Sequence, residues 1–265
     1  MALSVRAGLL CTLLLILFAT AAAAEDPTRL VICVDPLNMP YSEQGADPPG
    51  FDVEIGQMLA KELNRKFVIF WADTGTRGGL SRGLRRSIVA QECDAFMGIP
   101  LAPQTAGELA EMKLTLTRPY MSAGLVLVQR ASEDPIRDFE QLSLMKTGVQ
   151  LATLAEGVVF NRRFAMEHYH STEEALAGLA KNEVGAALLF GPKAGWAVQQ
   201  NYKDKLKISP AFQAKPEWQT SLGIAVRQPD TELKAKLDEA LGRMLADKRI
   251  ATVLAKYGVP FRSPD

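Results

Sequence analysis

The sequence predicts an α/β protein of two lobes, each an open, mostly parallel sheet flanked by helices. Two observations carry this prediction. β-rich apolar runs alternate with amphipathic helices along the chain, and two long extended segments, residues 117–130 and 218–230, enclose a separate α/β unit. Because such segments mark where a chain crosses between lobes, we place lobe 1 at residues 25–121 plus 224–265 and lobe 2 at residues 122–223.

Residues 1–24 have the features of a cleaved export signal. Arg6 provides a short positive segment, residues 9–18 an apolar core, and residues 19–24 the small side chains that a signal peptidase requires. The core is too short to span a membrane, which takes about 20 apolar residues. We therefore expect export, with cleavage near Ala24.

The charge balance argues against one class of partner. The chain has 30 basic and 30 acidic side chains, and 48% of its residues are apolar. A nucleic-acid-binding protein needs a clustered basic surface. We therefore expect a globular protein with a sizeable core and no nucleic-acid partner.

The first strand, loop and helix occupy residues 30–63. The apolar run of residues 30–34 ends at Asp35, a Pro- and Gly-rich loop carries Tyr41, and a helix with one apolar face begins after Gly50. Open α/β sheets bind ligands at the carboxyl ends of their strands. Tyr41 is therefore a candidate binding residue, in a loop that offers an aromatic ring and backbone donors but no nucleophile or base.

A second strand (residues 66–71) and a third (residues 94–99) flank a segment rich in Gly and Arg. Its arginines have two interpretations, an anion-binding cluster or the solvated face of a helix after a flexible loop. Gly78 and Gly79 are not followed by Gly-Lys-Ser/Thr, so no phosphate-binding loop is indicated. Both interpretations stay open for the arginines concerned, which are Arg77, Arg82, Arg85 and Arg86.

Two cysteines lie beyond the export signal, Cys33 in the first strand and Cys93 beside the third. These strands are neighbours in a doubly wound sheet, and an even number of cysteines in an exported chain favours a disulfide. The bridge closes a loop of about 60 residues and contributes about 4 kcal/mol by chain entropy. The alternative is a pair of buried free thiols.

The central unit is predicted to contain strands at residues 147–150, 167–170 and 185–190. Gln150 and Thr153 lie where its first helix begins. Their side chains and the free amides at this helix start either hold an anion or polar ligand or serve only to cap the helix.

Further helix boundaries follow from local signals. The first helix of the central unit is expected to run through Gly157 to Met166, and the next to begin with a capping box from Ser171 to Glu174. Asp230 is expected to cap a later helix, and the last helix ends at Tyr257.

Metal binding and catalysis are both disfavoured. His168 and His170 have no acidic or cysteine cluster of ligand spacing near them, which favours a surface role and indicates neither a metal nor a cofactor. An enzyme needs an acid or base placed in the cleft. The acids nearest to the candidate loops, Glu54 and Asp94, are explained by the helix and the strand that carry them, so we expect a protein without catalytic activity.

The order of these elements resembles the periplasmic solute-binding proteins of the amino-acid-binding type, solute-binding protein family 3. The resemblance covers nearly the whole mature chain. It implies a type II periplasmic-binding-protein fold, a ligand cleft between the lobes, a periplasmic location and a transporter permease as partner. The segments that carry it are MPYSEQGADPPGFDVEIGQMLAKEL, CDAFMG, LTRPYMSAGLVLV, STEEALAGLAKNEVGAAL and SLGIAVRQPDTELKAKLDEALGRMLADKRIATVLAKYG.

Two departures from this resemblance concern the ligand. Family members of this type usually carry an arginine, which binds the ligand carboxylate, just after the strand that matches CDAFMG, but this chain reads IPLAPQTAGELAEM. They usually end the third strand of the second lobe in an aspartate that binds the ligand ammonium, but this chain has Phe190. A zwitterion would leave two charges unpaired, so we expect a ligand other than a standard amino acid.

A narrower resemblance connects the chain to the solute-binding-like proteins found with PQQ-dependent methanol and other quinoprotein alcohol dehydrogenases. The segments VICVDPLNMPYS, ECDAFMGIP, TRPY, TGVQ and FGPKAGW carry it, although the loop after TGVQ is shorter than is usual there. It implies an accessory role toward a periplasmic quinoprotein alcohol dehydrogenase. The alternatives are the binding component of an ABC transporter for a small polar or aromatic solute and, less favoured, a periplasmic dehydratase.

The predicted cleft combines residues of both lobes. Tyr41 and Phe190 would hold an apolar or planar group between them if both line the cleft, while the alternative for each is ordinary core packing. The candidate set for ligand or partner binding is Tyr41, Arg77, Gln150, Thr153 and Phe190.

Overall fold

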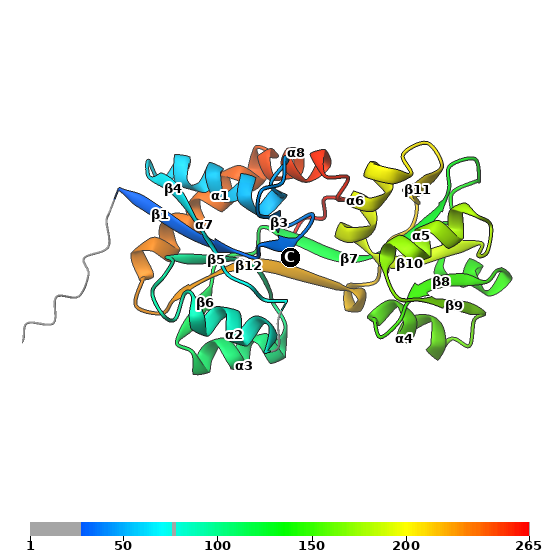
Figure 1. Cartoon of the computed structure of the whole chain (residues 1–265), viewed down its shortest axis with the longest axis horizontal. Helices are drawn as coiled ribbons and strands as arrows, with labels where there is room; N and C mark the ends of the chain where they lie inside the picture. Colours follow the sequence, from blue (N-terminus) through cyan, green and yellow to red (C-terminus); the bar gives the residue numbers. More distant parts are fainter. Residues whose placement is uncertain (1–27, 76–77, 265) are drawn as a thin grey trace, which may run out of the picture.

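The computed structural model describes residues 28–75 and 78–264, which form two lobes side by side along the long axis (Figure 1). The predicted export signal and Arg77 lie outside these residues. No helix in the described part of the chain is long and apolar enough to cross a membrane.

Lobe 1 is a sheet in the strand order β4-β1-β5-β12, with β1 parallel to both of its neighbours and β12 antiparallel to β5. Helices α1, α7 and α8 cover one face and α2 and α3 the other (Figure 1). The elements are β1 (Arg29–Val34), β2 (Leu37–Asn38), β3 (Ser42–Glu43), α1 (Phe51–Glu62), β4 (Lys66–Trp71), α2 (Gly79–Arg86), β5 (Ala95–Pro100), α3 (Pro103–Glu111), β6 (Leu114–Leu116), β12 (Gln219–Arg227), α7 (Thr231–Ala246) and α8 (Arg249–Lys256).

The alternation of side chains along β1 builds both cores of lobe 1. Leu30, Ile32 and Val34 join the apolar cluster under α1, α7 and α8, and Cys33 points to the cluster under α2 and α3. Cys33 and Cys93 form a disulfide across a Cα separation of 5.8 Å. The predicted bridge is confirmed, and it fastens the end of β1 to the chain that enters β5.

Lobe 2 continues the strand order as β7-β10-β8-β9, with β10 parallel to β8 and antiparallel to β7. Its core is divided between two apolar clusters on the two faces of this sheet. The elements are β7 (Met121–Arg130), the 3₁₀ helix η1 (Phe139–Leu144), β8 (Thr147–Gln150), α4 (Leu154–Asn161), β9 (Met166–Tyr169), α5 (Thr172–Ala180), β10 (Ala186–Phe190), α6 (Gly191–Asn201), β11 (Leu206–Ile208) and the 3₁₀ helix η2 (Pro216–Trp218).

The lobes are connected by β7 and β12. Residues 121–124 of β7 pair with β12, whereas residues 125–128 pair with β10 of lobe 2, so the crossing lies near Gly124. The C-terminal segment runs beside this hinge, because the Ser122 amide donates to the Arg262 carbonyl at 3.1 Å. The boundaries predicted from the sequence fall within this region, and the division of the chain at those residues stays a prediction.

A second contact joins the lobes away from these strands. The ring of Trp196 on α6 lies 5.6 Å from that of Tyr257 after α8, and Gln199 Nε2 donates to the Lys256 carbonyl at 2.9 Å. A Cβ atom at Gly195 would lie 2.1 Å from the Gly258 carbonyl oxygen. Glycine at position 195 therefore allows α6 of lobe 2 to rest on the backbone of lobe 1.

One predicted helix end is wrong, and at two predicted helix starts the position is confirmed but the capping contacts differ. Helix α4 ends at Asn161 and not at Met166, because the left-handed φ of 57° at Arg163 turns the chain toward β9. Ser171 Oγ accepts the Glu174 amide as a cap, but the Glu174 carboxylate accepts the amide of His170 and not that of Ser171. Asp230 stands at the start of α7 without capping it, since its carboxylate binds Arg227 at 2.7 Å.

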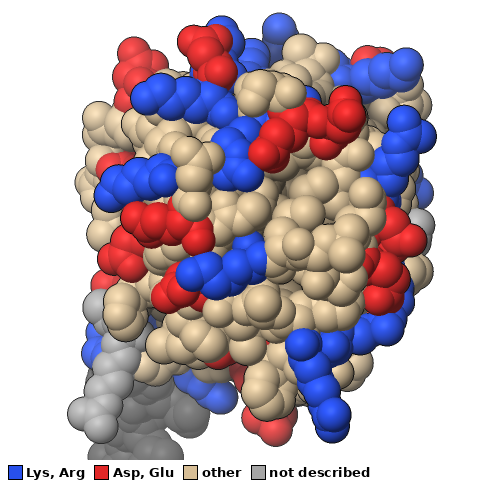
Figure 2. All heavy atoms as spheres, turned by 90° about the vertical axis from the view of Figure 1, so that its right-hand side faces the viewer, with Lys and Arg blue, Asp and Glu red and all other residues tan. Residues whose placement is uncertain are grey.

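The outer end of lobe 2 carries both signs of charge. Lys and Arg alternate with Asp and Glu around a mostly uncharged centre on this face (Figure 2). Leu144 and Phe160 are exposed apolar side chains of this lobe, Phe160 at 65%.

Candidate functional site

Two adjoining pockets lie at the carboxyl ends of the strands, where the lobes face each other. The first, of about 270 Å³, is called the acidic pocket because its lining includes Asp35 and Asp52. The second, of about 360 Å³, is called the apolar pocket and is lined mainly by lobe 2 and the hinge strands. Phe190, Lys193 and Thr220 line both pockets.

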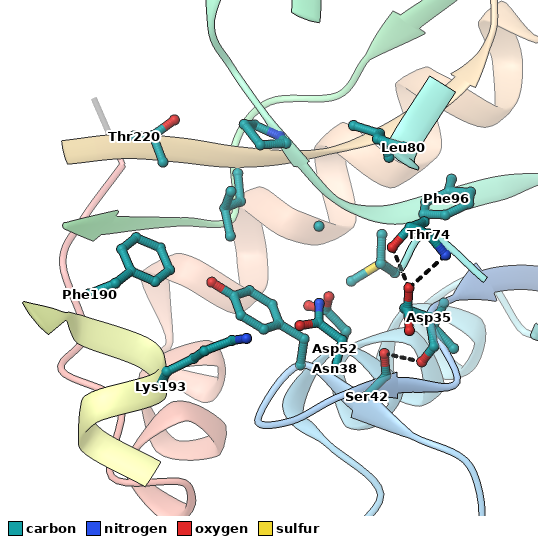
Figure 3. Close-up of a pocket in the computed structure, with 16 residues that line it drawn as sticks. Asp35, Asn38, Ser42, Asp52, Thr74, Leu80, Phe96, Phe190, Lys193 and Thr220 are labelled. Carbon is teal, nitrogen blue, oxygen red and sulfur yellow. Dashed lines mark hydrogen bonds between the residues drawn. The ribbon is translucent and has the colours of Figure 1, made fainter. Parts of the chain in front are cut away.

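Asp35 fixes the loop that follows β1. Its carboxylate accepts the amides of Leu37 and Thr74, each at 2.8 Å, and the Thr74 hydroxyl (Figure 3). The Ser42 hydroxyl donates to the Asp35 carbonyl at 2.7 Å. The acceptors of this carboxylate are thus used within lobe 1, and its role is to hold the loop against the chain after β4.

Asp52 is a buried acid on the floor of the acidic pocket. It lies in the first turn of α1, is 3% exposed and accepts the Tyr120 hydroxyl at 2.7 Å. Burial raises the pKa of Asp52 to about 7, and the hydrogen bond from Tyr120 opposes this rise. Gly98 has a φ of 75° and would bring a Cβ to 3.0 Å from the Asp52 carboxylate, so this position favours glycine.

Tyr41 belongs mainly to the core of lobe 1. Its ring lies 4.7 Å from that of Phe51, and it is 8% exposed, although it lines the acidic pocket. Burial, and then the negative charge of Asp52, raise the pKa of the Tyr41 hydroxyl far above its usual range. Phe190, at the end of β10 in the other lobe, is 36% exposed and offers much more of its ring to the pocket.

Gln150 and Thr153 line the apolar pocket, but their polar groups are used within lobe 2. Thr153 Oγ1 accepts the Glu156 amide at 3.5 Å and donates to the Gln150 carbonyl at 2.6 Å. Gln150 accepts the Thr172 hydroxyl at 3.2 Å and donates to the His170 carbonyl at 3.4 Å. The capping role is therefore present in the structure, and a role in ligand binding stays a prediction.

Lys193 is the cleft residue that sequence reasoning missed. It lies in the first turn of α6, is exposed and has no ion pair among the described residues. Figure 3 shows it extending from α6 into the acidic pocket, toward the side where Asn38 and Asp52 lie. Its place three residues after Phe190 in FGPKAGW is the signal that indicates it, since the first turn of a helix after a strand faces the ligand edge of such a sheet.

The other candidates lie away from both pockets. Arg82 and Arg86 line a separate depression with Phe70 and Trp71, and Arg85 is exposed on the same helix. No Arg lines either cleft pocket in the described part of the chain.

His168 and the two acids weighed for catalysis also have partners of their own, and His170 is exposed. His168 Nε2 lies 3.0 Å from the Glu156 carboxylate, and residues 28–75 and 78–264 contain no cluster of three potential metal ligands. Glu54 accepts the Tyr257 hydroxyl at 2.8 Å, and Asp94 accepts the Val31 amide at 2.8 Å. The side chains of His168, Glu54 and Asp94 are therefore explained by the fold.

Exposed apolar side chains follow the ends of several strands of both lobes. Leu37 and Leu101 follow the ends of β1 and β5 in lobe 1, and Leu151 and Leu154 follow the end of β8 in lobe 2. With Phe190 at the end of β10, they occupy the edge where sheets of this type bind ligands. We call these five residues the apolar rim.

The sequence of residues 30–260 matches the family model named bacterial extracellular solute-binding proteins, family 3. The chain belongs to this family. The family accounts for the two lobes and the cleft between them, and its members are solute-binding proteins.

Three relatives show the range of the family. The putative ABC transporter arginine-binding protein 2 of Escherichia coli K12 is 27% identical over 78% of this chain and 81% of its own length. The histidine-binding periplasmic protein of Salmonella typhimurium LT2 is 24% identical over 90% and 91%. Protein MoxJ of Methylorubrum extorquens AM1 is 24% identical over 91% and 84%.

The solved structures agree with the fold. The L-cystine solute receptor of Neisseria gonorrhoeae, in its unliganded open conformation, aligns with a TM-score of 0.73 at 16% identity, over 88% of this chain and 94% of that one. The predicted type II periplasmic-binding-protein fold is confirmed.

Proposed function

We propose that this solute-binding protein serves as a periplasmic accessory factor of a quinoprotein alcohol dehydrogenase, with a cleft adapted to an apolar group instead of an amino acid. The observation that carries the proposal is the chemistry of the cleft. Its described lining contains no arginine and includes Phe190 and Leu154, and the other three residues of the apolar rim follow strand ends at the same edge.

The energetic argument concerns the two charges of an amino acid. A charge that is moved from water into a closed cleft without a partner costs several kcal/mol. The Asp35 carboxylate is occupied by Thr74 and Leu37, and Asp52 is buried beneath Tyr41 and Tyr120. Neither acid replaces an exposed aspartate at the end of β10, so a ligand ammonium has no evident partner there.

The sequence resemblance to the binding-like proteins of quinoprotein dehydrogenases supports the accessory role, as does the similarity to protein MoxJ over 91% of the chain. The second candidate is the binding component of an ABC transporter. The arginine-binding and histidine-binding relatives favour it, and they are equally similar. Under both candidate functions the protein is exported, has no catalytic activity and binds its ligand or partner in the cleft.

A deletion strain separates the two candidates. The strain is complemented with the wild type, with a Leu154→Ala/Phe190→Ala variant that removes the two rim side chains of lobe 2 that line a cleft pocket, or with Phe160→Ala as a matched control. Phe160 is an exposed phenylalanine of lobe 2 that lines neither cleft pocket. Tyr41 is left intact because it packs in the core.

Under the proposal, alcohol dehydrogenase activity falls in the deletion strain, returns with the wild type and with Phe160→Ala, and stays low with the double variant. Unchanged dehydrogenase activity together with lost uptake of a small solute supports the transporter candidate instead.

A further inference from the structure

The lining of the apolar pocket is mostly apolar, and most of its polar groups are already hydrogen-bonded within the protein. Its walls come from apolar side chains of β7, η2 and the rest of lobe 2, and no Asp or Glu lines it in the described part of the chain. The amides of Gln150 and Gln219 are bonded within the protein, that of Gln219 to the Ala214 carbonyl at 2.6 Å. The walls are formed by Ala123, Leu125, Leu154, Leu189, Phe190 and Trp218.

Among the described residues, Lys193 is the one cation in this lining, and it lines both pockets. Its ammonium has no carboxylate within ion-pair distance among the described residues. The acids that face it across the cleft are Asp35 and Asp52, which are held by Thr74 and Tyr120 (Figure 3). Lys193 is therefore open to an anion from outside the protein.

We propose that the cleft binds a small apolar monocarboxylate, with its carboxylate on Lys193 Nζ and its hydrocarbon part between Phe190, Leu154 and Trp218. This inference rests on the proposed function, in which the cleft excludes zwitterionic amino acids, and it deepens that function by naming the class of ligand.

The size and the polarity of the pocket both fit this class. Its volume of about 360 Å³ lies at the small end of the usual range for ligand pockets. Burial of the hydrocarbon part removes apolar surface from water on both sides, and a carboxylate gives the ammonium a charge-assisted hydrogen bond. The anion is then held by lobe 2 and not by lobe 1.

The test compares four probes of one skeleton by calorimetry on the mature protein: 3-phenylpropionate, its amide 3-phenylpropanamide, 3-phenylpropylamine and phenylalanine. Hexanoate tests an aliphatic tail. We expect 3-phenylpropionate and hexanoate to bind. The amide is expected to bind at least roughly tenfold more weakly than 3-phenylpropionate, and 3-phenylpropylamine and phenylalanine, which carry an ammonium, are expected to bind least.

Two variants test whether Lys193 binds the ligand carboxylate. Lys193→Gln is expected to weaken 3-phenylpropionate roughly tenfold or more and to leave the amide unchanged. Lys203→Gln, which removes an exposed lysine from the same lobe outside both pockets, is expected to change neither.

The outcomes distinguish this inference from the function on which it rests. If neither carboxylate binds, or if Lys193→Gln binds them as well as the wild type does, the inference is wrong while the exclusion of amino acids stands. If phenylalanine binds as tightly as 3-phenylpropionate, the cleft accepts a zwitterion, and the proposed adaptation of the cleft fails as well.

Discussion

The two lobes have the same sheet architecture, but different interactions stabilise each of them. Lobe 1 has a disulfide, a buried Asp52–Tyr120 hydrogen bond and an ion network in which Glu62 on α1 pairs with Arg243 and Arg249 at 2.9 and 2.7 Å. In the described part of lobe 2 there is no disulfide, and each of its two apolar clusters is smaller than the cluster under α1, α7 and α8 in lobe 1.

The difference extends to the cleft. Lobe 1 contributes groups that are already occupied, such as Asp35 and Tyr41, whereas lobe 2 contributes groups that are open, above all Phe190 and Lys193. Lobe 1 thus serves as a fixed frame, and the selection of a ligand falls mainly to lobe 2.

The largest expected effect comes from the disulfide of lobe 1. A Cys33→Ser/Cys93→Ser variant loses a bridge with a sequence separation of 60 residues. We expect its free energy of unfolding to fall by about 4 kcal/mol, because the unfolded chain gains the entropy of the open loop. Urea unfolding measures the change, and reduced wild type is the control. Two alkylated thiols in unreduced, folded wild type would contradict the bridge itself.

The buried acid of lobe 1 gives the next effect. The folded pKa of Asp52, about 7, exceeds the ordinary value of 3.8, so the folded protein binds more protons than the unfolded chain between these pH values. This group therefore contributes stability below about pH 4 that is lost as the pH rises toward 7. Asp52→Asn removes the buried charge but can still accept from Tyr120.

We expect Asp52→Asn to raise the free energy of unfolding at pH 8, relative to the wild type, by on the order of 3 kcal/mol and to change it little at pH 4. Denaturant unfolding across this pH range measures the difference. Asp204→Asn, at an exposed acid of lobe 2, is the control and is expected to show no such trend. Equal differences at both pH values would show that burial does not perturb Asp52.

The smallest expected effect concerns the seam between the lobes. Gly195→Ala brings a Cβ to 2.1 Å from the Gly258 carbonyl, which forces α6 away from lobe 1, whereas Gly157→Ala on α4 meets nothing within 4 Å. We expect the first to destabilise by about 1–3 kcal/mol and the second to stabilise by up to about 1 kcal/mol. Thermal unfolding compares them, and equal shifts would show that the contact does not hold the lobes together.

The sequence predicted the features that depend on local pattern or on chain order. The apolar run of residues 30–34 and the two cysteines were enough to place β1, its pairing with the third strand of the lobe (β5) and the disulfide. The edge that carries Tyr41, Gln150, Thr153 and Phe190 followed from the rule that ligands meet strand ends.

Features decided by competition between partners were left open or missed. Tyr41 lies in the core because its ring packs against that of Phe51. Asp230 does not cap α7 because its carboxylate pairs with Arg227. Lys193 escaped notice because an exposed lysine at a helix start is ordinary in sequence. Its meaning appears only when the lining of two pockets shows that it has no partner among the described residues.

Helix α6 connects the cleft with the contact between the lobes at the end of α8. Its first turn carries Lys193 at the cleft, and two turns later Gln199 binds the backbone at the end of α8, with Gly195 resting on Gly258 between them. A rigid helix supported at its middle behaves as a lever. Tyr257 is buried, so any movement of lobe 2 that shifts Lys193 relative to lobe 1 would also shift Trp196 against the core of lobe 1, and the position of Lys193 in the cleft is coupled to the packing between the lobes.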